Sequence, residues 1–395
     1  MRLLKGGKIK IVRIIARLNI GGPAIHTILL TGGVDRKVFT THFAAGRPDA
    51  SEGDMAYFAE QNKVDVNYIS GLGRQIGLGD FLSFIKILGL LIKIKPDIIH
   101  THTAKAGALG RVAGVFAGVP VKIHTFHGHI FDGYFDPVKT KIFIFIEKFL
   151  GIFTDKVIVV SESIRNEIVD KLKIVPGGKC VVIRLGFDLG RFLNNERHKG
   201  AIRREFNIAH DTLLVGIVGR LVPIKNHKMF LKAARKVIDR MPGKNLKFLI
   251  VGDGESRQYL EKEVCKMGME KYVIFTGWIR DIDRVYADLD IAALTSLNEG
   301  TPVSLIEAMA SAKPVVATSV GGVIDIVRDG ENGLLAGPDD ADDFSDKIIS
   351  LLKDGKRREE MGLKGRDFAK SNFHKERLIK ETEGLYLSCL EAKGI

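Results

Sequence analysis

The segment IAALTSLNEGTPVSLIEAMASAKPVVAT, residues 291–318, shows the unit from which the rest of the chain is built. Ile291–Leu294 and Pro314–Thr318 are short and almost wholly apolar, which is typical of strands buried on both faces of a parallel sheet. Between them, Pro302–Ala312 has the apolar spacing of a helix that packs on a sheet. The segment therefore predicts a strand–helix–strand unit with parallel strands.

The same alternation extends over the chain in both directions. Further strands are predicted at Ile9–Ile15, Thr41–Ala45, Val64–Ile69, Asp97–His102, Val121–His127, Val157–Ser161, Val181–Leu185, Leu213–Val218, Lys247–Val251 and Val273–Thr276. Further helices are predicted at Ala104–Ala117, His227–Arg240 and Ser256–Lys266. Because 395 residues exceed what one hydrophobic core usually serves, we predict an α/β protein with two Rossmann-like, doubly wound domains.

The domain boundary is predicted within residues 186–211, which are polar and charged and lack a strand pattern. The first domain would then span residues 1–188 and the second residues 189–373. A charged amphipathic helix, His374–Leu390, follows the second domain. This helix could pack back onto the first domain, but the sequence does not show where it lies.

Composition excludes several classes of protein. The chain is 45% hydrophobic and 27% charged, which is ordinary for a globular protein and unlike a disordered chain or a coiled coil. Its three widely spaced cysteines form neither a disulfide framework nor a thiolate zinc cluster and favour a reducing compartment. No uncharged apolar run reaches 18 residues, and Met1–Ala16 resembles a first strand more than a signal peptide. We expect a cytoplasmic protein, with attachment to the inner face of the cell membrane as an option.

Positive charge is concentrated in the first half of the chain. Residues 1–200 contain 29 Lys and Arg against 17 Asp and Glu, whereas residues 201–395 contain 31 against 30. This asymmetry indicates an anionic partner, although a generally basic composition is an alternative. No nucleic-acid-binding motif is present, so a nucleic acid is excluded as the partner. Phe81–Lys95 and Lys139–Lys156 are apolar and framed by lysines, as are helices at a membrane surface, but helices facing a domain core have the same pattern.

The loop and helix within the opening segment predict an anion site. Thr301 is expected to be the N-cap and Pro302 the first helical residue, which leaves the amides of Val303 and Ser304 free at the positive end of the helix. Glu307 lies one turn further on, where ribose hydroxyls would suit its carboxylate. The alternative is an ordinary glutamate on a helix surface.

A second candidate is the loop Gly219–Asn226, which follows the predicted strand Leu213–Val218. Ligands of open parallel sheets bind beyond the carboxyl ends of the strands, where this loop carries Arg220 and Lys225. A guanidinium and an ammonium together suit a diphosphate. Two solvated charges are the alternative.

Two glycine-rich turns are further candidates. Gly21 and Gly22 come directly after the first strand region and precede a helix, so their backbone can approach a phosphate closely. Gly252 and Gly254 follow a strand of the second domain in the same way. Neither turn has the G-x-G-x-x-G pattern of dinucleotide-binding proteins, and a tight strand–helix turn explains each equally well.

Histidines gather near the end of Val121–His127. Alternation along a strand places His124 on the opposite face from His127 and His129, and no acidic residue or cysteine stands at ligand spacing. We therefore expect no metal site and interpret His127 as a neutral hydrogen-bonding group for a sugar. His100 and His102, which end the preceding strand, either line the same site or are strand-end residues.

Taken together, these motifs resemble those of the retaining glycosyltransferases of family 4, which have the two-domain GT-B architecture. The resemblance spans nearly the whole chain and rests on the order and spacing of five motifs: Gly21-Gly22, His127-Gly128, Gly219-Arg220 with Lys225-Asn226, Gly252-Asp253-Gly254, and the pair Glu299 and Glu307.

The resemblance implies a nucleotide-diphosphate sugar, bound mostly by the second domain, in a cleft that faces an acceptor on the first. Carried over by residue, the diphosphate would contact the Gly219 turn, Arg220 and Lys225, and the ribose would contact Glu307. The donor sugar would contact Glu299 and His127. Phosphate would also meet the backbone of Gly21 and Gly22 and the amides of Val303 and Ser304.

The resemblance further implies retention of anomeric configuration without a metal or other cofactor. One departure concerns the anion site: many relatives have Glu-Gly-Phe-Gly-Leu-Pro where this chain has Glu299-Gly300-Thr301-Pro302-Val303-Ser304. Pro302 lacks an amide that the usual glycine offers, and Ser304 offers one that the usual proline lacks. The departure leaves open which amides bind the phosphate.

Our leading hypothesis is an enzyme that transfers a hexosyl or N-acetylhexosaminyl group from a nucleotide sugar, with UDP as the expected nucleotide. The acceptor would be a glycan or a lipid-linked sugar at an anionic membrane surface, in polysaccharide or glycolipid synthesis. A nucleotide-sugar epimerase or hydrolase and a non-catalytic carbohydrate-binding protein are the alternatives.

Overall fold

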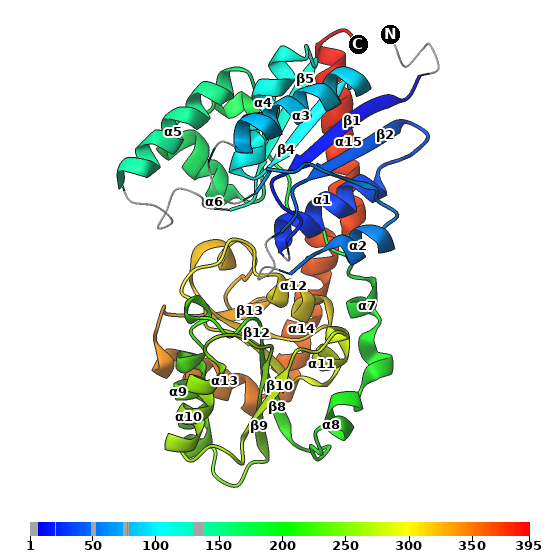
Figure 1. The fold of residues 1–395 in the computed structure, drawn as a ribbon. Helices are drawn as coiled ribbons and strands as arrows, with labels where there is room; N and C mark the ends of the chain where they lie inside the picture. Colours follow the sequence, from blue (N-terminus) through cyan, green and yellow to red (C-terminus); the bar gives the residue numbers. More distant parts are fainter. Residues whose placement is uncertain (1–6, 20, 49–52, 74–76, 78, 129–136) are drawn as a thin grey trace. The chain divides into compact units, whose positions relative to one another are not determined.

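The computed structural model describes residues 7–19, 21–48, 53–73, 77, 79–128 and 137–395. The chain forms two compact units, one of Met1–Phe187 with Lys375–Ile395 and one of Asp188–His374, which we call unit 1 and unit 2. Each unit is a parallel sheet between helices (Figure 1). This confirms the prediction of two Rossmann-like α/β domains.

Unit 1 contains a seven-stranded sheet in the order β3-β2-β1-β4-β5-β6-β7, with every neighbouring pair parallel. The strands are β1 (Ile9–Ile15), β2 (Phe39–Ala45), β3 (Val66–Tyr68), β4 (Ile98–His102), β5 (Val121–Phe126), β6 (Lys156–Val159) and β7 (Cys180–Val182). The helices are α1 (Gly22–Gly33), α2 (Ala56–Gln61), α3 (Gly79–Ile94), α4 (Ala104–Phe116), α5 (Pro137–Ile152), α6 (Glu162–Arg165) and α15 (Lys375–Ala392). Short π- and 3₁₀-helical segments lie at Asn166–Lys171 and Gly177–Lys179.

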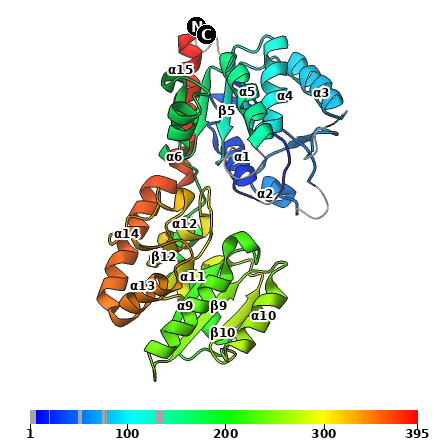
Figure 2. The same ribbon diagram turned by 90° about the vertical axis from the view of Figure 1, so that its left-hand side faces the viewer.

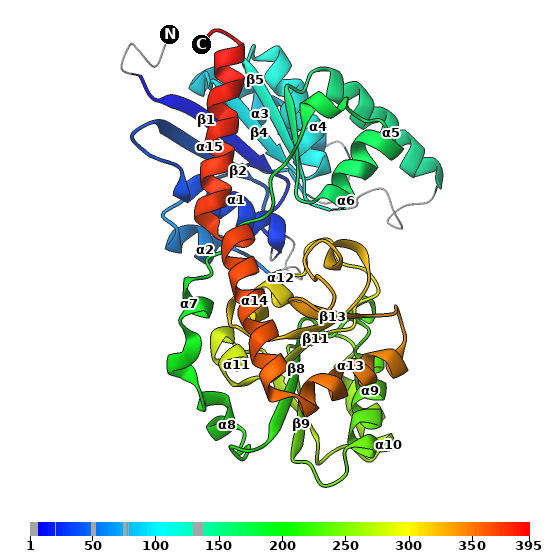
Figure 3. The same ribbon diagram turned by 180° about the vertical axis from the view of Figure 1, so that it is seen from behind.

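Alternation along β1 divides its side chains between two cores. Ile11 packs with residues of α1 and α15 on one face, while Val12 and Ile14 pack with residues of α3 and α4 on the other. Figures 1 and 3 show α15 running along the sheet of unit 1, although nearly 190 residues of unit 2 separate it from the rest of this domain. Tyr386 and Leu390 lie on the apolar side of α15, which is buried in the core of unit 1.

Unit 2 contains a six-stranded parallel sheet in the order β10-β9-β8-β11-β12-β13. The strands are β8 (Leu213–Val218), β9 (Leu246–Val251), β10 (Val273–Gly277), β11 (Ile291–Leu294), β12 (Val315–Thr318) and β13 (Gly333–Ala336). The helices are α7 (Gly190–Leu193), α8 (Ala201–Glu205), α9 (His227–Arg240), α10 (Arg257–Lys266), α11 (Ile282–Asp288), α12 (Val303–Ala310), α13 (Ala341–Lys353) and α14 (Gly355–Phe373). Turns of 3₁₀ helix lie at Asn195–His198, Pro223–Lys225 and Gly321–Val323.

Helices α9, α10 and α13 share one hydrophobic core with the sheet of unit 2 (Figure 2). In both units the strand order reverses beside the first strand of that unit, next to β1 and next to β8. The crevice outside the carboxyl ends of the strands at such a reversal is where ligands of open α/β sheets bind. The loops that follow β8 and β11 meet at this point.

The sequence-based element boundaries differ from the structure in a few places. The strand predicted at Val157–Ser161 ends at Val159, because the Ser161 hydroxyl accepts a hydrogen bond from the Ile164 amide and caps α6. The strand predicted at Val181–Leu185 also ends early, at Val182. Strand β13 was missed, because its four residues begin with a glycine and have no alternating pattern.

Candidate functional site

The loop after β8 is hydrogen-bonded to the end of β9 and to the loop that follows it. The Gly219 amide donates to the carbonyl of Val251, and the Leu221 amide donates to that of Asp253, at 2.9 and 3.0 Å. A Cβ on Gly252 would lie 2.0 Å from the Gly219 carbonyl oxygen, so this glycine is required by the close approach of two backbones. Gly254 is constrained in the same way by Leu221. For Gly252 and Gly254, the interpretation as a tight structural turn is therefore sufficient.

Arg220 and Lys225 lie in different environments within this loop. The Arg220 side chain is exposed and has no partner among the residues that the structure describes. Lys225 ends a 3₁₀ turn, and Asn226 follows it in the left-handed conformation with φ 47°, which asparagine tolerates better than most residues. The Lys225 and Asn226 carbonyls accept bonds from the Thr295 hydroxyl at the end of β11.

The Lys225 ammonium donates to Glu299 Oε1 at 2.5 Å, and the Ser296 hydroxyl donates to the same oxygen at 2.6 Å. Only 24% of the lysine side chain and 10% of the glutamate side chain are exposed. The Leu297 amide also donates to the Ile224 carbonyl at 2.9 Å. The loops after β8 and β11 therefore form one hydrogen-bonded unit, in which the carboxylate fixes the position of the ammonium.

A third loop, after β12, closes on the same place. The Gly322 amide donates to the Glu299 carbonyl at 2.8 Å. A Cβ on Gly322 would lie 1.7 Å from the Gly300 carbonyl oxygen, and Gly321 has φ +44°. Both positions therefore require glycine. These two glycines were not among the predicted site residues, although two adjacent glycines after a strand were the signal used for Gly21 and Gly22.

Helix α12 begins one residue later than predicted. Pro302, not Thr301, occupies the N-cap position, and its carbonyl accepts bonds from the amides of Leu305 and Ile306. The prediction that Thr301 caps the helix is wrong, because its side chain makes no capping bond and Pro302 has a non-helical ψ of 89°. Val303 and Ser304 are the first helical residues, and their amides have no acceptor among the described residues. The predicted pair of free amides at a helix start is present.

Glu307 lies one turn along α12 and faces a tyrosine of α11. The Tyr286 hydroxyl is 3.0 Å from the Ser304 carbonyl oxygen and 3.3 Å from Glu307 Oε2. Burial raises the pKa of Glu307 to about 7, and the positive charge of Arg191 and the Tyr286 hydroxyl offset part of this effect. At neutral pH the carboxyl is therefore poised between its two protonation states. Tyr286 and Arg191 were not predicted, because neither lies near a motif in the sequence.

In unit 1, the Gly21–Gly22 turn lies open. Gly21 is the N-cap of α1, and its carbonyl accepts a bond from the Ile25 amide at 3.2 Å. A Cβ on Gly22 would meet no atom of the protein within 4 Å, and one on Gly21 would meet only Pro23 at 3.8 Å. Packing within the described protein does not require these two glycines, which distinguishes them from Gly252 and Gly322.

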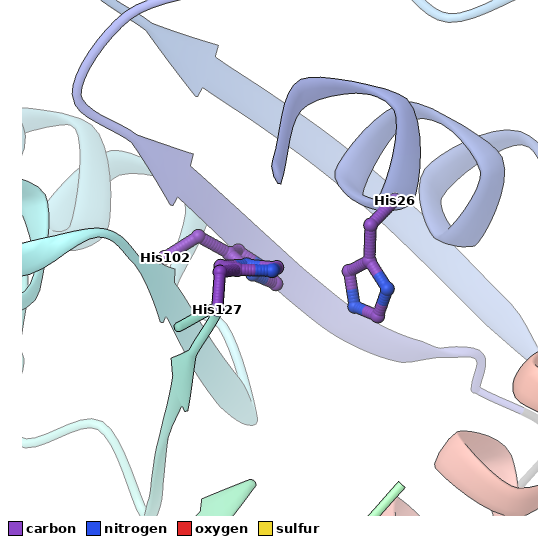
Figure 4. Close-up of side chains that lie close together, drawn as sticks. All are labelled: His26, His102 and His127. Atoms are coloured by element: carbon purple, nitrogen blue, oxygen red, sulfur yellow. The ribbon is translucent and has the colours of Figure 1, made fainter. Parts of the chain in front are cut away.

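His127 belongs to a cluster of three histidines (Figure 4). His26 comes from α1, His102 from the end of β4 and His127 from the residue after β5. His102 Nδ1 and His127 Nε2 are 3.0 Å apart, and the His26 ring lies 5.0 Å from that of His127 and 5.7 Å from that of His102. Burial lowers the pKa of His127 to about 3 and lowers the pKa values of His26 and His102 well below their usual range. All three are neutral at pH 7, as predicted for a hydrogen-bonding His127.

This cluster is also where a metal could bind. One nitrogen from each ring lies within 4.8 Å of the others, and the described residues contain no other such group. A tetrahedral zinc ion with bonds of about 2.0 Å requires nitrogens roughly 3.3 Å apart. The His102 and His127 nitrogens are already that close, so His26 is the residue that would have to move toward them. No carboxylate or thiolate belongs to the cluster. His26 was not among the predicted site residues, because a helix residue and strand residues that are far apart in sequence are brought together only by the fold.

The other histidines of this region have partners within unit 1. His124 lies on the opposite face of β5, as predicted, where its Nδ1 is 2.9 Å from the Thr101 hydroxyl. His100 contacts the Tyr386 hydroxyl at 2.6 Å and the Thr125 hydroxyl at 2.7 Å, so it connects β4 to α15. His129 lies outside the described residues.

Two Rossmann-like units, each an open parallel sheet between helices, are the architecture of the GT-B class of glycosyltransferases. Residues 20–191 match the profile of Glycosyltransferase Family 4, and residues 198–368 match that of Glycosyl transferases group 1. The chain belongs to the GT-B glycosyltransferases of family 4.

Similar curated proteins are also glycosyltransferases. The UDP-Gal:alpha-D-GlcNAc-diphosphoundecaprenol alpha-1,3-galactosyltransferase of Escherichia coli is 32% identical over 299 residues, which are 74% of this chain and 76% of that protein. The capsular polysaccharide biosynthesis glycosyltransferase CapM of Staphylococcus aureus is 25% identical over 85% of this chain and 88% of its own length.

Solved structures share the fold. Anabaena Alr3699/HepE in complex with UDP superimposes with a TM-score of 0.83 at 22% identity, over 96% of this chain and all of that one. The apo form of the lipopolysaccharide outer core galactosyltransferase WaaB has a TM-score of 0.71 at 17% identity, over 96% and 100%. These likenesses confirm the GT-B fold.

Proposed function

We propose that the protein is a retaining hexosyltransferase that uses a UDP-sugar and transfers its sugar to a lipid-linked glycan acceptor. The observation that carries the proposal is the bonded junction of three loops in unit 2, where Lys225 and the Gly322 amide both donate to Glu299, four residues before α12 begins. Such a junction offers fixed positive charge and free amides to a pyrophosphate. The UDP complex of the similarly folded Anabaena protein supports the choice of nucleotide.

In this proposal each residue of unit 2 has a separate task. Arg220, the Gly219 turn and Lys225 bind the diphosphate, and their charge stabilises the negative charge that develops as UDP leaves. The amides of Val303 and Ser304 contact phosphate at the positive end of α12. Glu307, with its proton lost, accepts hydrogen bonds from the ribose hydroxyls.

The donor sugar is assigned to Glu299 and to unit 1. Glu299 uses Oε1 for Lys225 and Ser296, so Oε2 is the atom offered to a sugar hydroxyl. His127 contacts the donor sugar near its anomeric carbon as a neutral group, and the backbone of Gly21 and Gly22 approaches phosphate. In this proposal both carboxylates of the site have other tasks, Glu299 at a hydroxyl of the donor sugar and Glu307 at the ribose. We therefore propose that the acceptor attacks on the same face from which UDP departs, without a metal or other cofactor.

The acceptor is the part of the proposal that rests on relatives. The E. coli protein is named for a diphosphoundecaprenol-linked acceptor, and CapM is named for capsular polysaccharide biosynthesis. We propose an acceptor of the same chemical class, a sugar joined through a diphosphate to a polyprenol in an anionic membrane. No described helix is long and apolar enough to cross a membrane.

A direct test combines nucleotide binding with a transfer assay. Purified protein is screened by thermal shift against UDP, GDP and ADP and their hexoses, and the stabilising donor is then incubated with a polyprenyl-diphosphate sugar. We expect stabilisation by the uridine compounds and an elongated lipid that keeps the anomeric configuration of the donor. Inversion of configuration would contradict the retaining mechanism. Release of free sugar or an isomerised donor without any need for acceptor would favour the hydrolase or epimerase alternative.

A further inference from the structure

Unit 1 exposes a large apolar surface on α3, α4 and α5. Of the 19 large hydrophobic side chains that are exposed in the described residues, 12 lie on these helices or on the residue after α5. We call this surface the α3–α5 face and define it by Phe81, Ile85, Phe116, Phe145, Phe149 and Ile152. Phe116 and Phe145 are 72% and 73% exposed, respectively. Isolated apolar residues are common on protein surfaces, but a contiguous patch marks an interaction site.

Helix α3 has two apolar sides. Ile87 and Leu91 are buried against the sheet, as expected of a helix that faces a domain core. On the other side, Phe81 and Ile85 are four residues apart and therefore lie on one stripe that faces solvent. Packing on the sheet therefore accounts for the apolar residues on the inner side of α3. The apolar residues on its outer side are not covered by any described part of the chain.

Helix α5 is oriented by a buried ion pair. Glu147 is 5% exposed, and both of its oxygens accept bonds from Arg111 Nη2 of α4 at 2.7–2.8 Å. With Glu147 turned inward, Phe145, Phe149 and Ile152 project outward at helical spacing. The only carboxylate of α5 is thus removed from the outer surface.

The three helices form one continuous layer. The rings of Phe84 on α3 and Phe116 on α4 are in edge-to-face contact, with centroids 6.1 Å apart, and the Arg111–Glu147 pair joins α4 to α5. Figures 1 and 2 both show α3, α4 and α5 side by side on unit 1. The apolar side chains of the α3–α5 face therefore lie on one layer of helices.

The charges on this layer have one sign. Asp80, the acidic residue of α3, is paired with Lys105 of α4 at 2.5 Å, and Glu147 is paired with Arg111. The remaining charged residues of the three helices are all lysines: Lys86, Lys93, Lys139, Lys141 and Lys148. An exposed apolar surface on helices whose other charged residues are lysines is the pattern of a protein face that lies in an anionic lipid interface.

We propose that the α3–α5 face binds the surface of an anionic membrane, with α3 and α5 lying in the interfacial plane. A second copy of this chain fits the surface less well, because a two-fold contact would bring the same lysines of both copies together. Anionic lipid headgroups neutralise those lysines, while the phenylalanines enter the acyl boundary. The biological purpose, access to a lipid-linked acceptor, rests on the proposed function, whereas membrane binding itself does not.

The test is flotation of the whole chain with vesicles of equimolar phosphatidylcholine and phosphatidylglycerol, and with vesicles of phosphatidylcholine alone. We expect binding to the anionic vesicles, weakening at high salt, and at least tenfold weaker binding for F145Q/F149Q. The variant K141Q/K148Q should lose most of the preference for anionic lipid. The matched control is Trp278→Gln, which removes a 65% exposed aromatic residue from unit 2 and should bind as the unmodified protein does.

Three outcomes would overturn the proposal: no binding of the unmodified protein to anionic vesicles, equal binding by F145Q/F149Q, or a stable dimer in solution that the same double substitution dissociates. Transfer to a water-soluble acceptor analogue separates this proposal from the proposed function. F145Q/F149Q should retain that transfer, which also shows that it is folded. A protein that binds vesicles but transfers to no acceptor would contradict the proposed function alone.

Discussion

The Lys225 ammonium and the Glu299 carboxylate, which belong to loops after different strands, are joined by a hydrogen-bonded ion pair of 2.5 Å. The pair is largely shielded from water, and Ser296 donates a second bond to the same carboxylate oxygen. An ion pair in such surroundings holds both groups in fixed positions more than it adds stability. The pair therefore holds the Lys225 ammonium, the partly buried cation of the proposed diphosphate site, in position before a ligand binds.

Replacement of Lys225 by alanine is expected to weaken UDP binding at least tenfold, about 1.4 kcal/mol, because a charge-assisted bond to phosphate is lost. Titration calorimetry would measure this. Lys228→Ala removes an exposed lysine three residues along and serves as the matched control, with unchanged affinity expected. If both variants bind UDP as tightly as the unmodified protein, Lys225 does not contact the diphosphate.

Glu307 predicts a pH-dependent stability of unit 2. Its pKa is raised to about 7 in the folded protein and is near its ordinary value when unfolded, so the folded state holds a proton that the unfolded state releases. Stability from this group is therefore lost as pH rises from about 5 to about 8, by at most roughly 3 kcal/mol. Glu307→Gln should abolish that slope in urea unfolding followed by Trp278 fluorescence. Parallel profiles for the two proteins would rule out the raised pKa.

The buried histidines of unit 1 predict the opposite response. Burial lowers the pKa values of His26, His100, His102, His124 and His127. The unfolded chain therefore binds protons below about pH 6.5 that the folded chain excludes, and unit 1 should lose stability progressively as the pH falls toward these lowered values.

The single tryptophan, Trp278, makes this measurable because it lies in unit 2. On acidification, circular dichroism should report loss of helix before Trp278 fluorescence changes. His26→Leu should lower the pH of that loss, since both His26 nitrogens are buried without a hydrogen-bond partner among the described residues. His210→Leu, an exposed control, should not. If the circular dichroism and the Trp278 fluorescence change at the same pH, the two units do not respond separately to acid.

Metal removal is expected to leave transfer unchanged, because Arg220, Lys225 and the α12 amides supply the charge stabilisation in the proposed mechanism. Activity measured after dialysis against EDTA should equal that of the untreated protein. Loss of activity on dialysis would point to the histidine cluster of unit 1. If EDTA abolishes activity, zinc restores it, and His102→Ala prevents restoration, then the cluster of His26, His102 and His127 holds a required metal.

Substitution by alanine should have different effects at Gly322 and Gly22, because the two glycines have different surroundings. Gly322→Ala places a Cβ against the Gly300 carbonyl, so we expect destabilisation of about 2 kcal/mol or more. Gly22→Ala meets no protein atom, and its melting temperature should be unchanged. If a phosphate approaches Gly22, however, kcat/KM should fall at least tenfold. A Gly22→Ala enzyme with normal kcat/KM would remove this residue from the donor site.

Much of the fold and part of the site followed from local sequence patterns. Strands β1, β8 and β11 and helix α9 were predicted with their observed boundaries, because apolar runs and periodicity are properties of neighbouring residues. The free amides of α12 were predicted although the position of Pro302 was wrong by one residue. The ion pair of Lys225 with Glu299, by contrast, has no signal in either loop alone.

The sequence by itself determined the alternation of strands and helices, the family motifs and the excess of lysine in the first half, since each depends on residue type and spacing. Only the tertiary structure decided that Tyr286 faces Glu307, that His26 joins His102 and His127, and that α15 completes unit 1. These contacts join residues on separate elements, and packing of those elements against a sheet sets which side chains meet. The same packing buried one side of α3 and α5 and left Phe81, Phe145 and Phe149 exposed. The apolar periodicity of these helices does not by itself show which side faces the sheet.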